Sequence, residues 1–398
     1  MDIVKRFLNY VSFETTSKEV ESTDRATSEG QYKLAEHLAE EIKGLGGQDV
    51  SINKFGTVHG YFPGDIKKEP ICLIAHMDTS PAASGKDIKP RIIDKYDGKD
   101  IALSDKVTMK VKDFPFLSRN VGHELIVTDG TTLLGADDKA GIAIIMDVAD
   151  HFVTNKLSHA PIEVCFSTDE EVGLGADHID LADIKAKFGY TVDGSDIEFL
   201  SIENFNAASM SLDINGRSIH PGSAKDKMIN ALNVGIDFHS ALPRFQRPEE
   251  TEGREGFYHL LSMSGNEEKA KMEYIVREHD INKLHAMLDY ARLDAKRIND
   301  KYKAEIIDLH IVETYRNMKS ELDKHPEAIN RIIDIYKKNN MPYQFAPIRG
   351  GTDGASLTFK GFPCPNLGTG GYNYHGRFEY EDVTQMKKMS SLLAQLFE

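Results

Sequence analysis

Short apolar runs that end in charged residues recur along the first two hundred residues. The runs at 71–76 and 161–167 lack alternation, which is typical of strands buried on both faces of a sheet. A capping-box pattern at 28–31 predicts the start of a helix that ends before Gly46, and a second helix is predicted at 140–153. Strands that alternate with helices predict an α/β fold, with helices packed on a sheet.

The pattern of strands that alternate with helices changes near Ala207, and it returns after residue 316. Between these points the sequence predicts, in order, a strand, a helix, two strands, a helix and a strand, at 208–214, 226–242, 257–263, 271–278, 282–300 and 306–312. This βαββαβ order is typical of ferredoxin-like domains. We therefore expect a catalytic domain in two parts, 1–206 and 317–398, with an inserted domain at 207–316.

Length and composition add limits on function. A chain of 398 residues is longer than most single cores, so two domains are expected. The net charge of −15 argues against a nucleic-acid partner and against an anionic membrane surface, and it is compatible with a site that attracts cations. The three cysteines are scattered in apolar runs, and the N-terminus lacks the apolar segment of a signal peptide. We expect a soluble, cytoplasmic protein.

Polar residues follow the predicted strands at one end. They are His76 and Asp78, then Asp137, Glu170 and Glu171, and Asp193, and a glycine-rich loop near the C-terminus adds His375. The carboxyl ends of strands in an open α/β sheet are where ligands bind. So many carboxylates repel one another unless cations neutralise them. Mixed imidazole and carboxylate ligands suit zinc, and also cobalt or manganese.

Each of these residues also has a simpler explanation. The pair at 137–138 could cap a helix, 169–171 could be a solvated acidic turn, and 193–194 could be an ordinary turn. His375 could hydrogen-bond within its own loop, and 76–78 could be a strand that ends in a polar loop. What favours a metal site is that such residues occur together at successive strand ends.

Several ordered motifs identify a family. The runs at 76–79, 135–141 and 169–171 resemble the co-catalytic zinc exopeptidases related to carboxypeptidase G and aminoacylase. The segments that resemble the tripeptide aminopeptidases of the peptidase T family are 204–208, 220–222, 251–258, 349–355 and 370–375. The resemblance covers nearly the whole chain. It implies a zinc-exopeptidase-like catalytic domain with a mixed central sheet, and it implies that the inserted ferredoxin-like domain is a lid.

The resemblance also implies two Zn²⁺ ions per subunit, with Co²⁺ or Mn²⁺ as substitutes. In that arrangement Asp137 bridges both ions, His76 and Asp193 complete the first site, and Glu171 and His375 complete the second. None of these five positions departs from the family pattern.

Further roles are implied for five other residues. Asp78 would orient His76, and Glu170 would be the general base. From the lid, His220 would polarise the scissile carbonyl. Arg349 would receive the substrate carboxylate, and Arg277 would lie near that carboxylate or else form a surface salt bridge.

The implied activity is hydrolysis of the N-terminal residue from tripeptides by a water between two zinc ions. A dipeptidase, a carboxypeptidase or an N-acyl amino acid amidohydrolase on the same scaffold are alternatives, and so is a non-enzymatic peptide-binding relative. The expected partners are small peptides, with no nucleic acid and no membrane. Some relatives pair through the lid, so a homodimer through 207–316 is an assembly that the resemblance allows.

Overall fold

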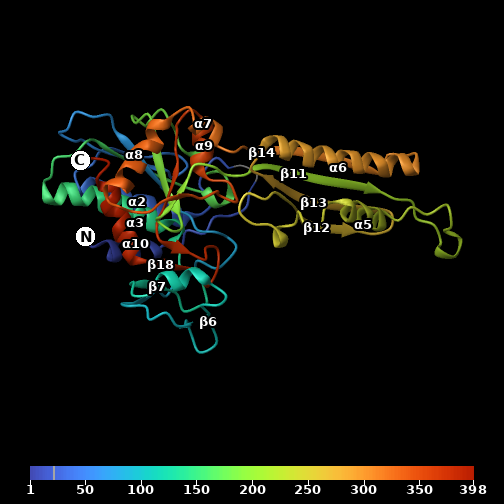
Figure 1. Ribbon diagram of the computed structural model, residues 1–398, viewed down its shortest axis with the longest axis horizontal. Helices are drawn as coiled ribbons and strands as arrows, with labels where there is room; N and C mark the ends of the chain where they lie inside the picture. The colour runs from blue at the N-terminus through green and yellow to red at the C-terminus, as the bar shows by residue number, and fades with distance from the viewer. Residues whose placement is uncertain (21–22) are drawn as a thin grey trace. The chain divides into compact units, whose positions relative to one another are not determined.

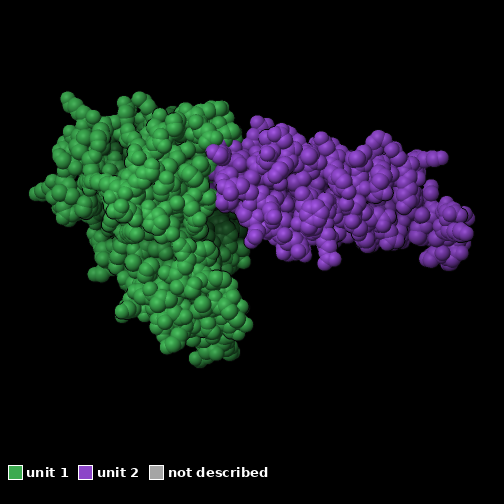
Figure 2. Space-filling model, viewed as in Figure 1, with its two compact units in different colours: residues 1–202, 320–346, 352–398 green, residues 203–319, 347–351 purple. Residues whose placement is uncertain are grey.

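The computed structural model describes residues 1–20 and 23–398, and the chain forms two compact units (Figures 1 and 2). Unit 1 consists of residues 1–202, 320–346 and 352–398, and unit 2 consists of residues 203–319 and 347–351. Unit 2 thus includes the expected insertion at 207–316. It also takes in the short segment 347–351, which comes from the C-terminal part of the chain.

Unit 1 is built on a mixed sheet of eight strands, in the order β1-β2-β8-β3-β9-β16-β10-β15. The strands are β1 (Gln48–Ile52), β2 (Val58–Phe62), β3 (Ile71–His76), β8 (Ile162–Ser167), β9 (Gly189–Gly194), β10 (Phe199–Ser201), β15 (Gln344–Phe345) and β16 (Asn366–Gly368). Every residue of β3 and β8 is buried, as their unbroken apolar runs predict.

The helices of unit 1 pack on this sheet or on one another (Figure 1). They are α1 (Ile3–Val11), α2 (Glu29–Gly44), α3 (Ala136–Asn155), α4 (Gly175–His178), α8 (Pro326–Lys338), α9 (Asp353–Phe359) and α10 (Val383–Ala394), with the short α7 (Lys319–Leu322) after the insertion. Helix α3 lies against β3 and β9, and α1 and α10 lie against α3. In the part of the chain that the structure describes, every helix is too short or too polar to cross a membrane.

Parallel pairing brings three strand ends to one edge of the sheet. Strand β3 runs parallel to both β8 and β9. In this register His76 lies opposite Ser167 of β8, and Ile74 lies opposite Thr191, two residues before Asp193. The polar residues that follow these strands therefore meet at one edge, as the sequence predicts.

A smaller antiparallel sheet carries the C-terminal glycine-rich loop. Its order is β17-β18-β7-β4, and a separate two-stranded sheet lies nearby in the sequence. These strands are β4 (Arg91–Ile93), β5 (Ile101–Ala102), β6 (Thr108–Met109), β7 (Leu125–Val127), β17 (Gly371–Tyr372) and β18 (Tyr380–Asp382). The loop that joins β17 to β18 contains His375. Pairing of β18 with both β17 and β7 anchors the two ends of that loop.

Unit 2 has the expected βαββαβ order and an antiparallel sheet, β12-β13-β11-β14. Its elements are β11 (Asn206–Asn215), α5 (Ala231–Ala241), β12 (Phe257–Gly265), β13 (Lys269–Glu278), α6 (Ile281–Tyr302) and β14 (Ile307–Tyr315). Helices α5 and α6 pack on the sheet and bury residues such as Leu212, Val276 and Leu288 in one apolar core (Figure 1). The predicted α/β class with a ferredoxin-like insertion is confirmed.

The start of α2 differs from its prediction. Among the described residues no backbone N–H donates to the side chain of Ser28, so the expected capping box does not form. The Ser28 hydroxyl instead accepts a hydrogen bond from the side-chain amide of Gln31 at 3.1 Å. The same amide group also reaches Asp169, far along the chain. The Gln31 side chain therefore forms a tertiary contact instead of a hydrogen bond to the backbone of its own helix.

Close packing of α3 on β9 depends on a glycine. A Cβ atom at Gly141 would lie 2.0 Å from the carbonyl oxygen of Val192 and 2.5 Å from Asp138 Oδ1. No side chain fits without moving the helix away from the strand that carries Asp193.

Replacing Gly141 with Ala is expected to lower the free energy of unfolding by about 1–3 kcal/mol, because the added methyl group overpacks this contact. Urea unfolding measures the change. Gly44→Ala is the matched control, since among the described residues a Cβ there meets nothing within 4 Å beyond its chain neighbours and its own helix backbone. That helical substitution should leave stability equal or raise it by about 0.4–1 kcal/mol. Equal stability of the two variants would contradict the close approach.

Candidate metal centre

Five side chains of unit 1 gather at the edge where the parallel strands end. They form two groups, one of His76, Asp137 and Asp193 and the other of Asp137, Glu171 and His375. Within each group the ligand atoms lie within 4.8 Å of one another. The five residues are those that the resemblance implies as ligands, and they fall into the same two sets.

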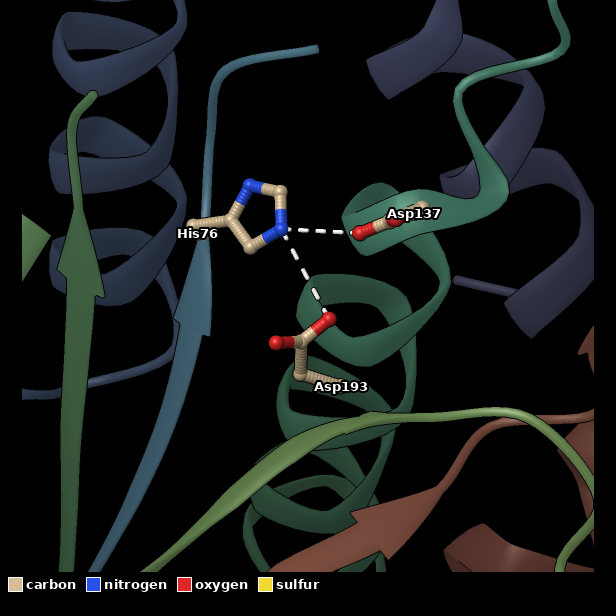
Figure 3. Close-up of side chains that lie close together, drawn as sticks. All are labelled: His76, Asp137 and Asp193. Carbon is tan, nitrogen blue, oxygen red and sulfur yellow. Dashed lines mark hydrogen bonds and ion pairs between the residues drawn. The ribbon is translucent and has the colours of Figure 1, made fainter. Parts of the chain in front are cut away.

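Asp137 is shared by both groups and directs one oxygen into each. Its Oδ1 lies 2.8 Å from His76 Nε2, which is also 3.6 Å from Asp193 Oδ1 (Figure 3). Its Oδ2 lies 3.1 Å from His375 Nε2, which is also 2.9 Å from Glu171 Oε2. A carboxylate with one oxygen in each group has the position of a bridging ligand.

The orientation of His76 is fixed from its other side. Its Nδ1 lies 3.1 Å from the carbonyl oxygen of Asp78 and 3.4 Å from Asp78 Oδ1. An Nδ1–H that donates there leaves Nε2 free to face Asp137 and Asp193, which is the usual arrangement of a metal-binding histidine. The backbone N–H of His76 donates to Asp138 Oδ2 at 3.2 Å. Both the ring and the main chain of His76 are therefore held.

Asp78 also holds the turn that follows β8. Its two carboxylate oxygens accept the backbone N–H groups of Glu170 and Glu171, at 3.1 and 3.2 Å. This contact joins the end of β3 to the turn that carries the candidate base and one ligand. The sequence did not indicate this second contact of Asp78.

Two further carboxylates, those of Asp138 and Glu379, accept backbone N–H groups of the candidate ligands. Glu379 is buried and accepts the N–H groups of Leu134, Gly135 and Asp137 at 2.6, 2.9 and 3.1 Å. Asp138 accepts the His76 N–H described above. The doubled aspartate at 137–138 is a signal that could have pointed to Asp138, whereas no motif surrounds Glu379.

Burial determines the direction of the pKa shift for three carboxylates of the centre, whereas hydrogen bonds determine it for Asp137. Burial raises the pKa of Asp193 to about 7, and the nearby Asp137 adds to the rise. Burial also raises the pKa of Glu171 and holds that of Glu170 well above its usual range. Burial acts in the same direction on Asp137, but hydrogen bonds from the two histidines outweigh it and keep that pKa below its usual value. Carboxylates crowded in this way resist ionisation unless cations are present.

The donor set fits two divalent cations. Glu171 Oε1 is buried and has no hydrogen-bond partner among the described residues. A buried carboxylate oxygen without a partner is costly, and a metal ion would satisfy it. Two imidazole nitrogens and carboxylate oxygens are donors that transition metals prefer.

The three candidate substrate residues lie in unit 2, whereas the ligands and Glu170 lie in unit 1. His220 is exposed, and its Nδ1 accepts the N–H of Gly222 at 3.2 Å. Arg277 donates to the carbonyl oxygens of Ala208 and Val276 and lies over the ring of Tyr315. In the described part of the chain Arg277 forms no ion pair, so the surface salt bridge that the sequence left open is absent there.

Arg349 is held within unit 2 by aromatic rings and by a loop. Its guanidinium carbon lies 5.1 Å from the ring centre of Phe205 and 5.6 Å from that of Phe257. Its two terminal nitrogens donate to backbone oxygens of Thr251, Gly253 and Glu255 and to the Thr251 hydroxyl. The acceptors are all neutral. Arg349 thus ties the segment 347–351 to the loop at 251–255.

Comparison with known proteins identifies the family. The chain is 43% identical over 401 residues to a protein named peptidase T from Clostridium novyi (strain NT), and the alignment covers 100% of this chain and 98% of that protein. The chain belongs to the peptidase T family. The family expected from the motifs is confirmed, and the enzyme class with it.

Other matches agree with this peptidase T assignment. Residues 202–303 match the family described as peptidase dimerisation domain, and residues 124–205 match the family described as M42 glutamyl aminopeptidase. A tripeptidase from Staphylococcus aureus subsp. aureus Mu50 shares the fold, with a TM-score of 0.78 and 20% identity over 99% of this chain and 96% of that one. A dinuclear metal-binding peptidase of the M20 family from Bacillus subtilis has a TM-score of 0.62 and 12% identity over 99% and 97% of the two chains.

Metal binding to this peptidase T family member is expected to release protons near neutral pH. Hydrogen bonds to Asp137 and Glu171 raise the pKa of His375 to about 11, so its ring holds a proton that a metal must displace. Asp193, with a pKa of about 7, is partly protonated as well. Protons compete with the metal, so the apparent affinity should rise with pH, by about tenfold per pH unit for each proton released.

Calorimetric titration with Zn²⁺ in two buffers of different ionisation enthalpy measures the number of protons released. His375→Ala should release fewer protons than the unmodified chain. The matched control is His310→Ala, which removes an exposed histidine of unit 2 outside both metal groups. An affinity that stays constant from about pH 6 to about pH 8 would contradict the competition.

Proposed function

We propose that this chain is a tripeptide aminopeptidase, which hydrolyses the first peptide bond of a tripeptide and releases the N-terminal residue. One observation carries the proposal: two groups of metal-ligating side chains share Asp137, and the half-buried Glu170 stands beside one of their members. The family name of its relatives and the tripeptidase that shares its fold support a tripeptide as the substrate.

Two zinc ions are the proposed cofactors, with Co²⁺ or Mn²⁺ as substitutes. His76 and Asp193 would hold one ion, Glu171 and His375 would hold the other, and Asp137 would hold both. When bound, two such ions lower the pKa of a water between them and polarise the scissile carbonyl. The dinuclear metal-binding relative supports the count of two.

Glu170 is the proposed general base. Its backbone N–H donates to Asp78, which fixes the residue next to the ligand Glu171, and its carboxylate belongs to neither metal group. Burial raises its pKa well above that of an ordinary glutamate, so its basicity is closer to that required near neutral pH. It can take a proton from the attacking water and later give that proton to the leaving amine.

Residues of unit 2 would bind the substrate. The exposed His220 has no partner for Nε2 among the described residues, so it can donate to the carbonyl oxygen as negative charge develops there. Arg349 and Arg277 would face the C-terminal carboxylate. A carboxylate can replace the neutral acceptors of Arg349 because a charge-assisted, two-pronged hydrogen bond is the stronger contact. Recognition of the carboxylate would then limit the length of the peptide.

Pairing of two copies of the chain through unit 2 is also proposed. The match of residues 202–303 to a peptidase dimerisation domain supports it.

A substrate screen tests the proposed activity. Tripeptides with free termini should be cleaved faster than dipeptides, C-terminally blocked peptides or N-acetyl amino acids, and a chelator should abolish cleavage. Glu170→Gln should lower kcat at least about 100-fold while two metal ions per chain remain, because only the base is lost. Product analysis by mass spectrometry and metal analysis measure both outcomes.

The outcomes of this screen separate the alternatives. A preference for dipeptides or for N-acetyl amino acids would move the chain to another activity on the same scaffold. Full activity of Glu170→Gln would contradict the assignment of Glu170 as the general base. A cleavage rate that the chelator does not change would exclude metal-dependent hydrolysis.

Replacing Arg349 with Ala tests its proposed contact with the substrate. The variant should lose at least about tenfold more kcat/KM on a tripeptide with a free carboxylate than on its C-terminal amide, because only the carboxylate gains a charge-assisted bond. Arg254→Ala is the matched control, since Arg254 lies on the loop that Arg349 contacts but pairs with Glu203. If both variants lose activity equally on both peptides, Arg349 only holds the loop at 251–255.

A further inference from the structure

Asp169, the residue before the proposed base, is buried in an unusual backbone conformation. Its φ is 62°, in the left-handed region that residues other than glycine rarely occupy. Left-handed backbone at such a residue persists only when its surroundings hold it there. The turn that begins at Asp169 carries Glu170 and Glu171.

The start of α2 supplies most of the groups that hold the Asp169 side chain, and His178 Nδ1 lies 3.6 Å from its Oδ2. The Thr27 backbone N–H donates to Asp169 Oδ2 at 2.9 Å, and the Thr27 hydroxyl donates to Oδ1. Gln31 makes two opposed hydrogen bonds with the same residue. Its Nε2 donates to Asp169 Oδ1 at 2.7 Å, and its Oε1 accepts the Asp169 backbone N–H at 3.0 Å. We call Thr27 and Gln31 the N-terminal clamp.

The clamp acts on both the side chain and the main chain of Asp169. Gln31 is fully buried, as is Asp169, so these hydrogen bonds are shielded from competing water. The use of the Gln31 amide here also explains why the capping box at 28–31 does not form. A side chain that would ordinarily close its own helix is directed instead to a turn 138 residues later in the chain.

The turn at 169–171 is therefore held from two sides. On one side Asp78 accepts the N–H groups of Glu170 and Glu171. On the other side the clamp fixes the peptide unit and carboxylate of Asp169. Glu171 has an additional contact, with His375, whereas no hydrogen bond to the Glu170 side chain occurs among the described residues. The position of the Glu170 carboxylate thus depends on the backbone of the turn.

We propose that Thr27 and Gln31 are positioning residues for the reaction, which set the place of the Glu170 carboxylate through Asp169. The inference rests on the proposed role of Glu170 as the base. The segment at the start of α2 then controls proton transfer without touching substrate or metal.

The test compares variants that remove the clamp with one that only weakens α2. Gln31→Leu removes the amide contacts with Asp169 and Ser28 at similar volume. Thr27→Val removes the hydroxyl contacts with Asp169 and with the Lys18 N–H but keeps the backbone N–H that donates to Asp169. Each should lower kcat on a tripeptide, by about 10- to 100-fold for Gln31→Leu, because displacement of a catalytic group by about 1 Å has effects of that size. KM and metal content should change less than about twofold, since the ligands and the carboxylate receptor keep their contacts.

Two further variants serve as controls. Thr27→Ser keeps the hydroxyl and should restore kcat relative to Thr27→Val. Leu38→Ala removes a buried side chain from the same helix without touching Asp169, so it should lower the unfolding temperature but not kcat at a temperature where it is folded.

Several results would overturn the inference. An unchanged kcat in Thr27→Val and Gln31→Leu would do so, and so would an equal loss of kcat in Leu38→Ala or a loss of metal that parallels the loss of kcat. If Gln31→Leu does not fold, the pair Thr27→Val and Thr27→Ser decides alone. Failure of the proposed function is distinct, because the unmodified chain would then not cleave tripeptides or Glu170→Gln would remain active.

Discussion

Mutual repulsion among buried carboxylates is the constraint on which the rest of the structure depends. Asp137, Glu171 and Asp193 converge on two histidines, and burial raises the pKa of the last two carboxylates. Such a cluster is stable only when its backbone is held and its charge is balanced. The fold answers the first need with further carboxylates, Asp78 and Glu379, which accept backbone N–H groups beside the ligands. Cations would answer the second need.

The two needs divide the acidic residues of the centre into two kinds. The ligand carboxylates direct oxygens at the two histidines of the centre. The supporting carboxylates direct their oxygens at main-chain N–H groups instead. Glu379 illustrates the second kind, since the N–H groups of Leu134, Gly135 and Asp137 all donate to it. Main-chain donors favour the ionised form of a carboxylate without adding a second charged side chain. Burial and the charge of Asp137 nevertheless raise the pKa of Glu379 to about 7, so the supporting carboxylates fix geometry but add to the repulsion at the centre.

Unit 2 contributes a positive charge, that of Arg349, which is held by neutral groups. Arg349 lies over two aromatic rings and donates only to neutral oxygens, so its positive charge is positioned but not neutralised. Stacking and backbone contacts give an arginine a fixed direction at low electrostatic cost. A guanidinium held in this way remains able to attract an anion. The same contacts also stabilise the loop at 251–255, so binding and structural roles are combined in one side chain.

The sequence by itself determined the family, the βαββαβ insertion and the set of residues at the strand ends. It did so because apolar periodicity and short motifs are local, and parallel strands bring their carboxyl ends to one edge. Only the tertiary structure decided the partners of Gln31, the supporting role of Glu379 and the contacts of Arg349. Gln31 shows the reason. A side-chain amide can bond its own helix or a distant turn, and the choice depends on what folding packs beside it, which no local pattern records.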